Sequence, residues 1–264
     1  MCFGSGGQEQ AEFEEMPVPT ANPRVPYDTV FEDENILVVD KPRGRVTMPG
    51  RGHARDSLVN GVFSSHGAVL ARLGDRRDYG LLHRLDRATS GLVVFARTVR
   101  AYEFLRDAFA EQRVEKSYLT IVRGKLPRRA GRVEIRLRQV RRGDLRVSVP
   151  DPRGLEARTS WKVLSSRGLR SLLHCQIETG RLHQIRAHLA ALGCPVEGDT
   201  LYTGDGPDHR ASVARAADRS LLLHAWKLGL PHPERRKLLR LQAPPPEHLR
   251  QAAGEWGLDL DTTP

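Results

Sequence analysis

Short apolar runs separated by turns dominate this sequence, and they constrain its fold more than any other feature. Many runs are joined by segments that contain glycine or proline, which is typical of strands connected by turns. Their order does not repeat a strand-helix unit, so the pattern favours an α+β fold over a doubly wound parallel sheet. The predicted strands are residues 36–39, 92–96, 118–122, 133–137, 145–149, 157–164, 172–177, 221–230 and 238–242.

Two stretches have the periodicity of an amphipathic helix. The stretch that comes later in the chain spans residues 182–192 and has the apolar stripe Leu182, Ile185 and Leu189. We expect this helix to end at Gly193, because glycine commonly follows the last helical residue. In the first, apolar side chains recur at the spacing i, i+3, i+4, i+7 and i+8, so one face should pack on the sheet. These side chains are Ala101, Phe104, Leu105, Ala108 and Phe109.

The composition indicates a folded chain in a reducing compartment. Of the 264 residues, 39% are hydrophobic and 28% charged, which is enough apolar material for a sizeable core. No run approaches the roughly 18 to 20 apolar residues of a membrane span, and the start lacks the pattern of a secretion signal. The three cysteines, Cys2, Cys175 and Cys194, are scattered, which argues against a disulfide framework and a structural metal site. We therefore expect a cytoplasmic protein.

An acidic, proline-containing segment precedes the first apolar run. Residues 1–23 hold four glutamates and no lysine or arginine, so residues 1–24 are predicted to be a flexible tail with little capacity to pack. A less favoured alternative is an acidic decoy that competes with a ligand for a basic groove. Since no linker divides the rest of the chain, residues 25–264 are expected to form a single domain.

Positive charge is abundant and locally concentrated. The chain has 42 basic and 32 acidic residues and a formal net charge of +10, which indicates a polyanionic partner. Residues 128–146 hold eight arginines against two acids, a local net charge of +6. This cluster favours phosphate contacts over base stacking, because few aromatic residues interleave with it. The alternative is a solvated hairpin whose arginines simply point outward.

A polar loop lies between two apolar segments. Residues 83–91 read HRLDRATSG and follow Leu81 and Leu82; a polar loop in such a place often carries function. Cations flank Asp86 on both sides and favour its charged form, and an ionised, desolvated carboxylate can act as a nucleophile or base. Spacing alone slightly favours the alternative, in which Asp86 only forms a tight turn with Thr89 and Ser90.

A second polar string connects a predicted strand to the second predicted helix. Residues 178–188 read ETGRLHQIRAH, and Gly180 turns the chain. This places Arg181 at a helix N-terminus, where backbone N–H groups also favour anions. Arg181 is therefore predicted to clamp a phosphate or a carboxylate, or, alternatively, to pair only with Glu178.

The histidines and Tyr118 do not indicate a reaction by themselves. His183 and His188 are five positions apart and so face different sides of the helix, whereas two metal ligands on one face need a spacing of three or four. Together with His83, they are expected to be hydrogen-bonded histidines rather than metal ligands. Tyr118 lies in a predicted strand, where most tyrosines are packing residues.

Five motifs occur in one order along residues 31–233. They are FEDENILVVDKPRG, HRLDRATSG, EKSYLTIVRG, ETGRLHQIRAHLAALGCPVEGDTLY and LLLHAWKLGLPHP. Together they closely resemble the motifs of the RluA-type pseudouridine synthases, and five motifs in one order are specific where any one would be weak. Arg43, Arg45, Arg87 and Leu182 depart from the usual pattern, which bears on substrate choice and RNA contacts.

The resemblance implies a fold and a domain organisation. The fold is α+β, with a mixed, mainly antiparallel central sheet, flanking helices and a catalytic cleft. Residues 25–264 would be a single catalytic domain. Unlike many relatives, the chain is expected to lack an N-terminal S4-like RNA-binding module, because only the acidic tail precedes the first motif.

The resemblance also implies an activity. The chain would isomerise specific uridines in structured RNA, ribosomal or transfer RNA, to pseudouridine, by base flipping and without a cofactor or metal. Asp86 would be the essential carboxylate, which either attacks C1′ or removes the 2′ proton. Tyr118 would stack on the flipped uracil, Arg181 would pair with the aspartate, and Arg84 would fill the gap in the RNA stack. The predicted RNA-binding arginines are Arg84, Arg128, Arg129, Arg136, Arg138, Arg141 and Arg142.

The expected partner is therefore RNA. We expect no membrane, no obligate protein partner and a monomer. Two other functions stay open at this point. A base-releasing glycosidase would use Asp86 and Glu178 as a pair of carboxylates and admit water. A non-catalytic RNA-binding relative would not need Asp86.

Overall fold

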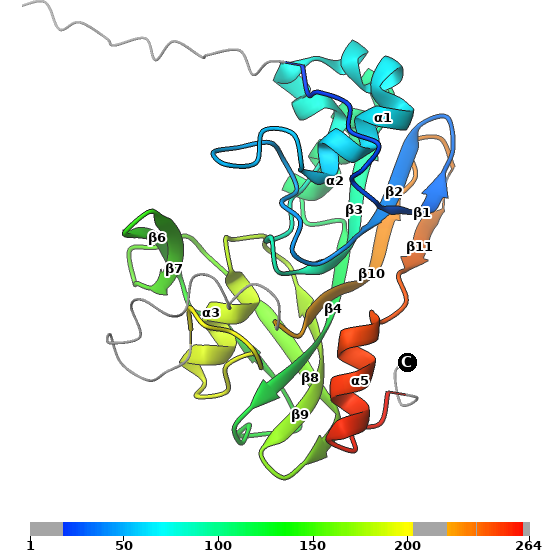
Figure 1. Ribbon diagram of the computed structural model, residues 1–264. Helices are drawn as coiled ribbons and strands as arrows, with labels where there is room; N and C mark the ends of the chain where they lie inside the picture. Colours follow the sequence, from blue (N-terminus) through cyan, green and yellow to red (C-terminus); the bar gives the residue numbers. More distant parts are fainter. Residues whose placement is uncertain (1–17, 203–220, 236, 261–264) are drawn as a thin grey trace, which may run out of the picture.

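A long mixed sheet runs through the molecule (Figure 1). The computed structural model describes residues 18–202, 221–235 and 237–260. In this part of the chain the strand order is β1-β2-β3-β10-β4-β9-β8-β5, with β11 paired to β10. Among the strands described, β3 and β10 alone pair in parallel, and the other neighbours are antiparallel. The α+β prediction with a mainly antiparallel sheet is confirmed.

The strands of this sheet are short to medium in length. They are β1 (Asp28–Glu32), β2 (Ile36–Lys41), β3 (Ser90–Ala96), β4 (Glu115–Arg123), β5 (Ala130–Val133), β8 (Thr159–Arg167), β9 (Arg170–Ile177), β10 (Leu223–Pro231) and β11 (Leu238–Gln242). A separate antiparallel hairpin consists of β6 (Leu137–Arg142) and β7 (Leu145–Pro150). It projects from the body of the molecule beside α3 (Figure 1).

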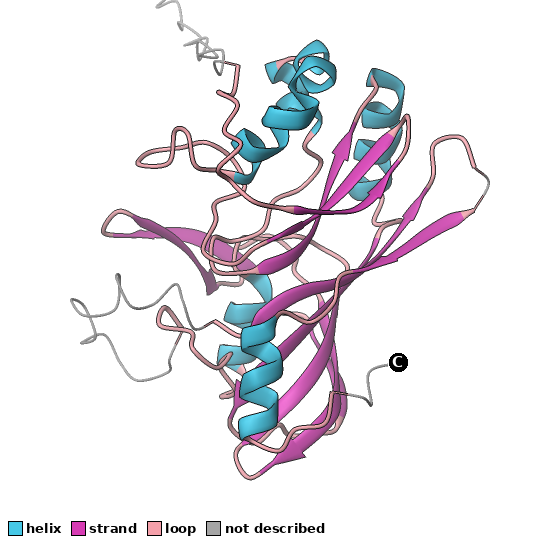
Figure 2. Cartoon of the chain, turned by 45° about the vertical axis from the view of Figure 1, so that its right-hand side comes forward, coloured by secondary structure: helices cyan, strands magenta, loops and turns pink. Residues whose placement is uncertain are grey.

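Helices pack on both faces of the sheet (Figure 2). Because successive strand residues point to opposite faces, Leu37 and Val39 join the core that includes α1 and α3, whereas Ile36 and Val38 join the core that includes α2. A third core packs α5 on the sheet around Trp226. The helices are α1 (Leu58–Leu70), α2 (Val99–Ala110), α3 (Gln184–Ala191) and α5 (Glu247–Glu255), with short 3-10 turns at Ala71–Leu73 and Asp75–Gly80.

Most of the predicted strands form near their expected places, but the one at residues 133–137 is wrong. It spans the end of β5 and the start of β6. The carbonyl of Ile135 accepts a hydrogen bond from His188, and that of Arg136 accepts one from the backbone N–H of Asp151. Because these partners lie outside the sheet, the chain leaves one strand and begins another.

The second predicted helix begins later than expected. Its first residue is Gln184, and His183 precedes it in a left-handed conformation with φ +52°. The expected end at Gly193 is confirmed, since the helix stops at Ala191 and Gly193 has φ +73°. Arg181 therefore lies three residues before the helix, not at its N-terminus, and Arg186 lies in the first turn.

Two helices were not predicted, for physical reasons. Helix α1 is buried around most of its first half, so it lacks the polar face that reveals an amphipathic helix. Its capping box uses Ser57 with Asn60 rather than a glutamate or glutamine. Helix α5 buries only Leu249 and Ala253, which is too few apolar positions to show a period.

Some predictions concern residues outside the described part. Residues 1–17 of the predicted tail and Cys2 belong to this group, and a single domain over residues 25–264 stays a prediction. Cys175 and Cys194 are buried free thiols. None of the helices described here has the length and apolar character to cross a membrane.

Gly91 allows β3 and β10 to approach each other at the parallel contact. It pairs with Ala225, and its backbone φ of +116° is rarely adopted by residues that carry a side chain. A Cβ at this position would lie 2.2 Å from the carbonyl oxygen of Ala225. Glycine is therefore required where the strand that follows the Asp86 loop enters the sheet.

We predict that Gly91→Ala destabilises the protein by about 3 kcal/mol, because backbone strain and a backbone clash add at one site. The matched control is Gly254→Ala, since Gly254 lies in α5 with open space around its Cβ position. This control should stabilise the protein by about 0.5 to 1 kcal/mol. Denaturant unfolding of both variants tests the prediction, and equal stabilities would contradict it.

Candidate active site

Asp86 lies on the loop that enters β3, and hydrogen bonds hold this loop in place. The hydroxyl of Thr47 donates to the carbonyl of Leu85 at 2.8 Å and accepts from its N–H at 3.2 Å. The buried Lys41 donates to the carbonyl of Arg87 at 3.3 Å. The N–H of Thr89 donates to the carbonyl of Asp86 at 3.1 Å. The tight turn considered for this segment is thus present in the backbone, and it leaves the Asp86 carboxylate available.

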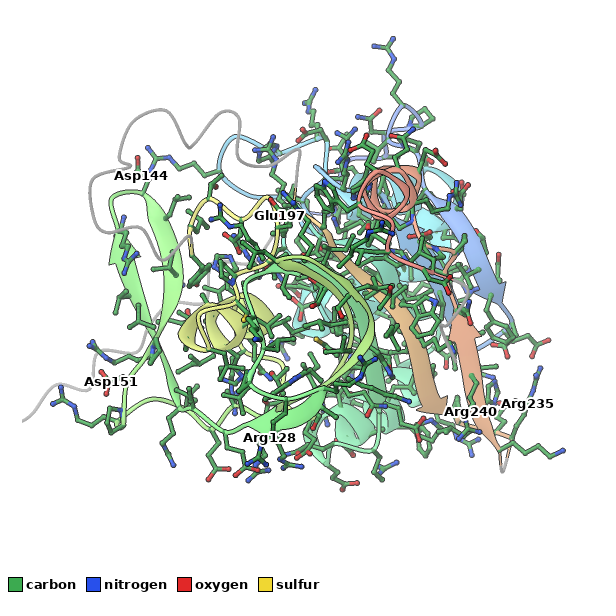
Figure 3. All side chains as sticks on the ribbon, turned by 90° about the horizontal axis from the view of Figure 1, so that it is seen from below. Arg128, Asp144, Asp151, Glu197, Arg235 and Arg240 are labelled. Atoms are coloured by element: carbon green, nitrogen blue, oxygen red, sulfur yellow. The ribbon has the colours of Figure 1, made fainter. Side chains whose placement is uncertain are left out.

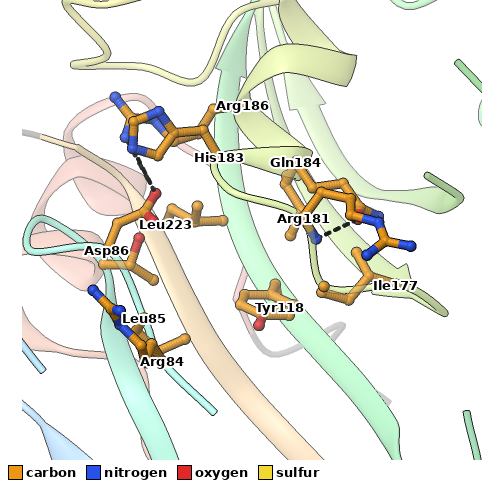
Figure 4. A pocket seen from close by; sticks show the side chains of 13 residues that line it. Arg84, Leu85, Asp86, Tyr118, Ile177, Arg181, His183, Gln184, Arg186 and Leu223 are labelled. Atoms are coloured by element: carbon orange, nitrogen blue, oxygen red, sulfur yellow. Dashed lines mark hydrogen bonds and ion pairs between the residues drawn. The ribbon is translucent and has the colours of Figure 1, made fainter. Parts of the chain in front are cut away.

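The Asp86 carboxylate faces Arg186 and His183 through one oxygen (Figure 4). Arg186 Nη1 donates to Oδ2 at 3.2 Å, and His183 Nε2 lies 3.7 Å from the same atom. No hydrogen bond within the described part of the chain engages the other oxygen, Oδ1. The side chain of Asp86 is 20% exposed. One oxygen is therefore held by protein groups while the carboxylate stays accessible.

Arg186 is itself fixed from behind. Its Nε donates to Asp199 Oδ2 at 2.7 Å and its Nη2 donates to Oδ1 at 2.9 Å, which is the bidentate geometry of a strong arginine-carboxylate pair. The guanidinium also lies 5.3 Å from the centre of the Tyr202 ring. Burial lowers the pKa of Arg186, but hydrogen bonding to Asp199 and the charges of Asp199 and Asp86 raise it more, so the net shift is upward. Arg186 is thus a permanent, immobile cation beside Asp86.

The predicted pairing of Arg181 with Asp86 is wrong. The exposed side chain of Arg181 donates from Nε to the carbonyl of Glu156 at 3.0 Å, and its backbone N–H donates to Gln184 Oε1 at 3.0 Å. The alternative partner, Glu178, is also not used by Arg181, because it binds Arg132 at 2.7 Å. Figure 4 shows Arg181 across the pocket from the carboxylate.

The sequence did contain a signal for Arg186. It lies between Ile185 and Ala187 on a helix whose first half is wholly buried, and a buried arginine needs a carboxylate partner. The helix was predicted to begin at residue 182 rather than at Gln184, and the resemblance gave the pairing role to Arg181 instead of Arg186.

Tyr118 lies on β4 and lines the same pocket as Asp86. It is 8% exposed, and burial, together with the charge of Asp86, raises its pKa. The phenol is therefore neutral at physiological pH. Leu85, Ile177 and Leu223 add apolar wall around it. The pocket thus combines one carboxylate, one aromatic ring and apolar surface.

The pocket opens into a larger cationic cleft. Arg51, Arg84, Arg87 and Arg146 line this cleft, and so does Lys116. Burial, and then the charge of Arg181, lowers the pKa of Lys116 to about 8. The hairpin β6–β7 contributes Gln139, Leu145 and Arg146 to one wall. The predicted RNA-contacting Arg84 is exposed at the mouth of the Asp86 pocket.

The other predicted RNA-binding arginines do not form one surface. Arg128, between β4 and β5, lies far from Asp144 at the tip of the hairpin (Figure 3), and neither it nor the adjacent Arg129 lines the cleft. Arg136 and Arg138 lie near the acids Glu156 and Asp151.

The hairpin arginines have a different environment. Arg141, Arg142 and Arg146 have no ion pair within the described part of the chain. They lie on β6 and β7, in the hairpin that forms one wall of the cleft.

The histidines near the motifs make hydrogen bonds, as predicted. His83 Nε2 accepts from the N–H of Val94 at 3.2 Å. His188 binds Thr159 and the carbonyl of Ile135, each at 2.9 Å. His183 lies 3.0 Å from the hydroxyl of Tyr202. Each of these three rings therefore has at least one hydrogen-bond partner.

Known proteins resemble this chain over most of its length. Ribosomal large subunit pseudouridine synthase D of Nitrosomonas europaea is 35% identical over 225 residues, which cover 85% of this chain and 64% of that protein. The protein of the same name from Zymomonas mobilis is 35% identical over 228 residues, which cover 86% and 71%. An uncharacterized RNA pseudouridine synthase of Chloroflexus aurantiacus is 41% identical over 211 residues, which cover 80% and 63%. This chain thus spans about two thirds of the length of these relatives.

The fold is also similar to a solved structure. The human RNA pseudouridylate synthase domain containing 4 matches with a TM-score of 0.69 at 24% identity and covers 88% of this chain and 94% of its own. The family model described as RNA pseudouridylate synthase matches residues 35–191, more than half of the chain, and this segment includes Asp86, Tyr118 and Arg186. The chain therefore belongs to the RNA pseudouridylate synthase family.

Proposed function

We propose that this chain isomerises uridine to pseudouridine within structured RNA, and that Asp86 is the carboxylate that reacts. The observation that carries the proposal is the pocket, in which an arginine-bound carboxylate faces an apolar, aromatic wall. Ribosomal RNA is the favoured substrate, because two of the relatives described above are named for the large ribosomal subunit. Transfer RNA is the alternative.

The isomerisation exchanges one bond of the nucleoside for another. The bond from N1 to C1′ breaks, the uracil turns, and C5 forms a bond to C1′; the hydrogen on C5 leaves as a proton and N1 gains one. Asp86 either attacks C1′ or removes the 2′ proton, and in both cases Oδ1 is the oxygen that the protein leaves available. Arg186 holds Oδ2 and so orients the carboxylate before substrate arrives.

The walls of the pocket suit a base that is detached and then rejoined. Tyr118 offers the face of a neutral ring on which uracil can stack. Leu85, Ile177 and Leu223 exclude water from the detached base. A pocket of this kind keeps the detached uracil in place and so favours the new bond from C5 to C1′ over release of the base.

Within the described part of the chain, the base-releasing alternative lacks a second carboxylate that faces the pocket. Glu178 does not line the pocket or the cleft; it binds Arg132 and lies 3.6 Å from Arg158. Asp199 is close to the site, but its fully buried side chain is occupied by Arg186. A glycosidase with two working carboxylates is therefore not favoured by this site.

RNA binding supplies the energy that base flipping requires. Extrusion of a base costs a few kcal/mol, and phosphate contacts can offset it through counterion release. We assign this role to Arg84 at the pocket mouth and to the hairpin arginines 141, 142 and 146, which lack acidic partners within the described residues. We also propose that the chain acts as a monomer in the cytoplasm, without an obligate protein partner.

We predict that Asp86→Asn lowers turnover at least about 10³-fold, because the reacting carboxylate is replaced by a neutral amide. The measurement uses RNA labelled with tritium at C5 of uridine, since the isomerisation releases this hydrogen to water. Mass spectrometry of the unlabelled RNA after reaction with the wild type should show unchanged mass. Loss of one uracil would indicate the glycosidase, and persistent turnover in the variant would contradict the role of Asp86.

Arg186→Lys should lower kcat about 10²-fold, because lysine keeps the charge but cannot bind Asp86 and Asp199 at the same time with a planar fork. The matched control is Arg181→Lys, for which kcat should change less than about threefold. Equal losses in the two variants would return the pairing role to Arg181. Thermal unfolding separates a loss of turnover from a loss of fold.

The hairpin assignment predicts a change in salt dependence. Replacing the hairpin arginines 141, 142 and 146 with glutamine should reduce the slope of log K against log salt by about 2, at about 0.7 per phosphate contact for single-stranded nucleic acid. The control replaces Arg132, Arg136 and Arg138, whose charges are already paired with acids. Filter binding across salt concentrations measures both. An unaltered slope in the first variant would overturn the assignment.

A further inference from the structure

We infer that His183 and Tyr202 form a positioning pair for Asp86, in which the tyrosine hydroxyl fixes the imidazole so that its Nε2–H points at Asp86 Oδ2. The inference rests on the proposed function, because it concerns the same carboxylate. It adds a second group to Arg186 in orienting the carboxylate whose Oδ1 is left for the substrate.

The position of the hydrogens follows from the contacts of Tyr202. The backbone N–H of Ser148 donates to its hydroxyl oxygen at 2.9 Å, and the hydroxyl lies 3.0 Å from His183 Nδ1. A backbone N–H can only donate, so the oxygen of Tyr202 accepts there, and in the inferred pair the hydrogen of the hydroxyl is directed to Nδ1. Burial raises the pKa of Tyr202 to about 12, so this hydrogen is retained.

The imidazole is consequently held as one neutral tautomer. Burial lowers the pKa of His183, and this effect exceeds the opposing effect of the Asp86 charge. A neutral ring whose Nδ1 accepts a hydrogen bond carries its hydrogen on Nε2. That atom is the one that lies 3.7 Å from Asp86 Oδ2.

Arg186 and His183 act on the same oxygen. Arg186 Nη1 is 3.2 Å from Oδ2, on which Nε2 of His183 also converges. The longer distance is compatible with a catalytic hydrogen bond that tightens when substrate binds. Two donors on one oxygen fix the plane of the carboxylate and leave Oδ1 for the substrate.

The backbone supports the same conclusion. His183 adopts φ +52° and ψ +24°, a left-handed conformation that is uncommon for a residue with a Cβ. Its ring meets the Tyr202 ring edge to face, with 5.7 Å between the centres. The N–H of Tyr202 donates to Asp199 at 3.2 Å, so the carboxylate that holds Arg186 also holds the tyrosine. A strained residue kept in place by its surroundings is typical of a functional site.

Three single variants separate the hydrogen bond from the backbone strain. In His183→Gln the amide nitrogen reaches the place of Nε2, whereas in His183→Asn it reaches only the place of Nδ1. Asparagine is the better residue for the left-handed conformation. We expect kcat to fall about tenfold in His183→Asn and in Tyr202→Phe, and less than about threefold in His183→Gln, with KM for RNA unchanged in all three.

The control and the double variant test the connection between the two residues. Tyr27→Phe removes the hydroxyl from another tyrosine-histidine pair, 3.3 Å from His66 and outside both the pocket and the cleft, and it should leave kcat unchanged. The double variant of His183→Asn and Tyr202→Phe should be no slower than His183→Asn alone, because the tyrosine acts only through the histidine. If the loss of kcat in the double variant equals the product of the two single losses, the pairing is overturned.

A readout without turnover completes the test. Nitrogen-15 NMR of the His183 ring should show hydrogen on Nε2 in the wild type and a mixture of tautomers in Tyr202→Phe. A hydrogen on Nδ1 in the wild type, a loss confined to KM, or full kcat in both His183→Asn and Tyr202→Phe would overturn the inference. If the wild type forms no pseudouridine in any RNA while the NMR result holds, the proposed function fails and the pairing geometry stands.

Discussion

The site depends on the placement of Arg186 between two carboxylates. Asp199 fixes the guanidinium by two hydrogen bonds, and the remaining nitrogen reaches Asp86. A buried charge is tolerated only with such partners, so the arginine that orients Asp86 also ties α3 to the loop before β3. Removing Arg186 would leave two carboxylates without their shared cation, and removing Asp199 would leave the guanidinium held only by Asp86. The contacts that orient Asp86 are therefore the same contacts that hold this region of the fold together.

Residues far apart in the sequence meet at the Asp86 pocket because the sheet places their strands side by side. β3 follows the Asp86 loop, β4 carries Tyr118, and β10 lies between these two strands. Gly91 permits the close parallel contact of β3 with β10. The helix that carries Arg186 packs in the core that also contains Tyr118. The pocket thus forms only when strands from both halves of the chain have paired.

The sequence revealed what is periodic or carried by a motif, and it failed where tertiary contacts decide. The apolar runs of β2 and β3 and the stripe of α2 were visible, and the motif around Asp86 indicated the chemistry. Arg186 was missed because the start of α3 is set by the side chain of Gln184, which binds Thr179 and the carbonyl of Arg158. The arginine cluster looked uniform in the sequence, yet acids from other segments pair with some of its members.

All three guanidinium nitrogens of Arg186 already donate to carboxylates, and this has a consequence for what can enter the pocket. Because Asp86 and Asp199 together offset its charge, this buried guanidinium offers little to a phosphate. The cationic cleft attracts the sugar-phosphate chain, whereas the cation beside the reacting carboxylate is already occupied by two acids. An uncharged nucleobase needs no cation there. The molecule therefore sorts the two parts of a nucleotide by charge before any shape recognition takes place.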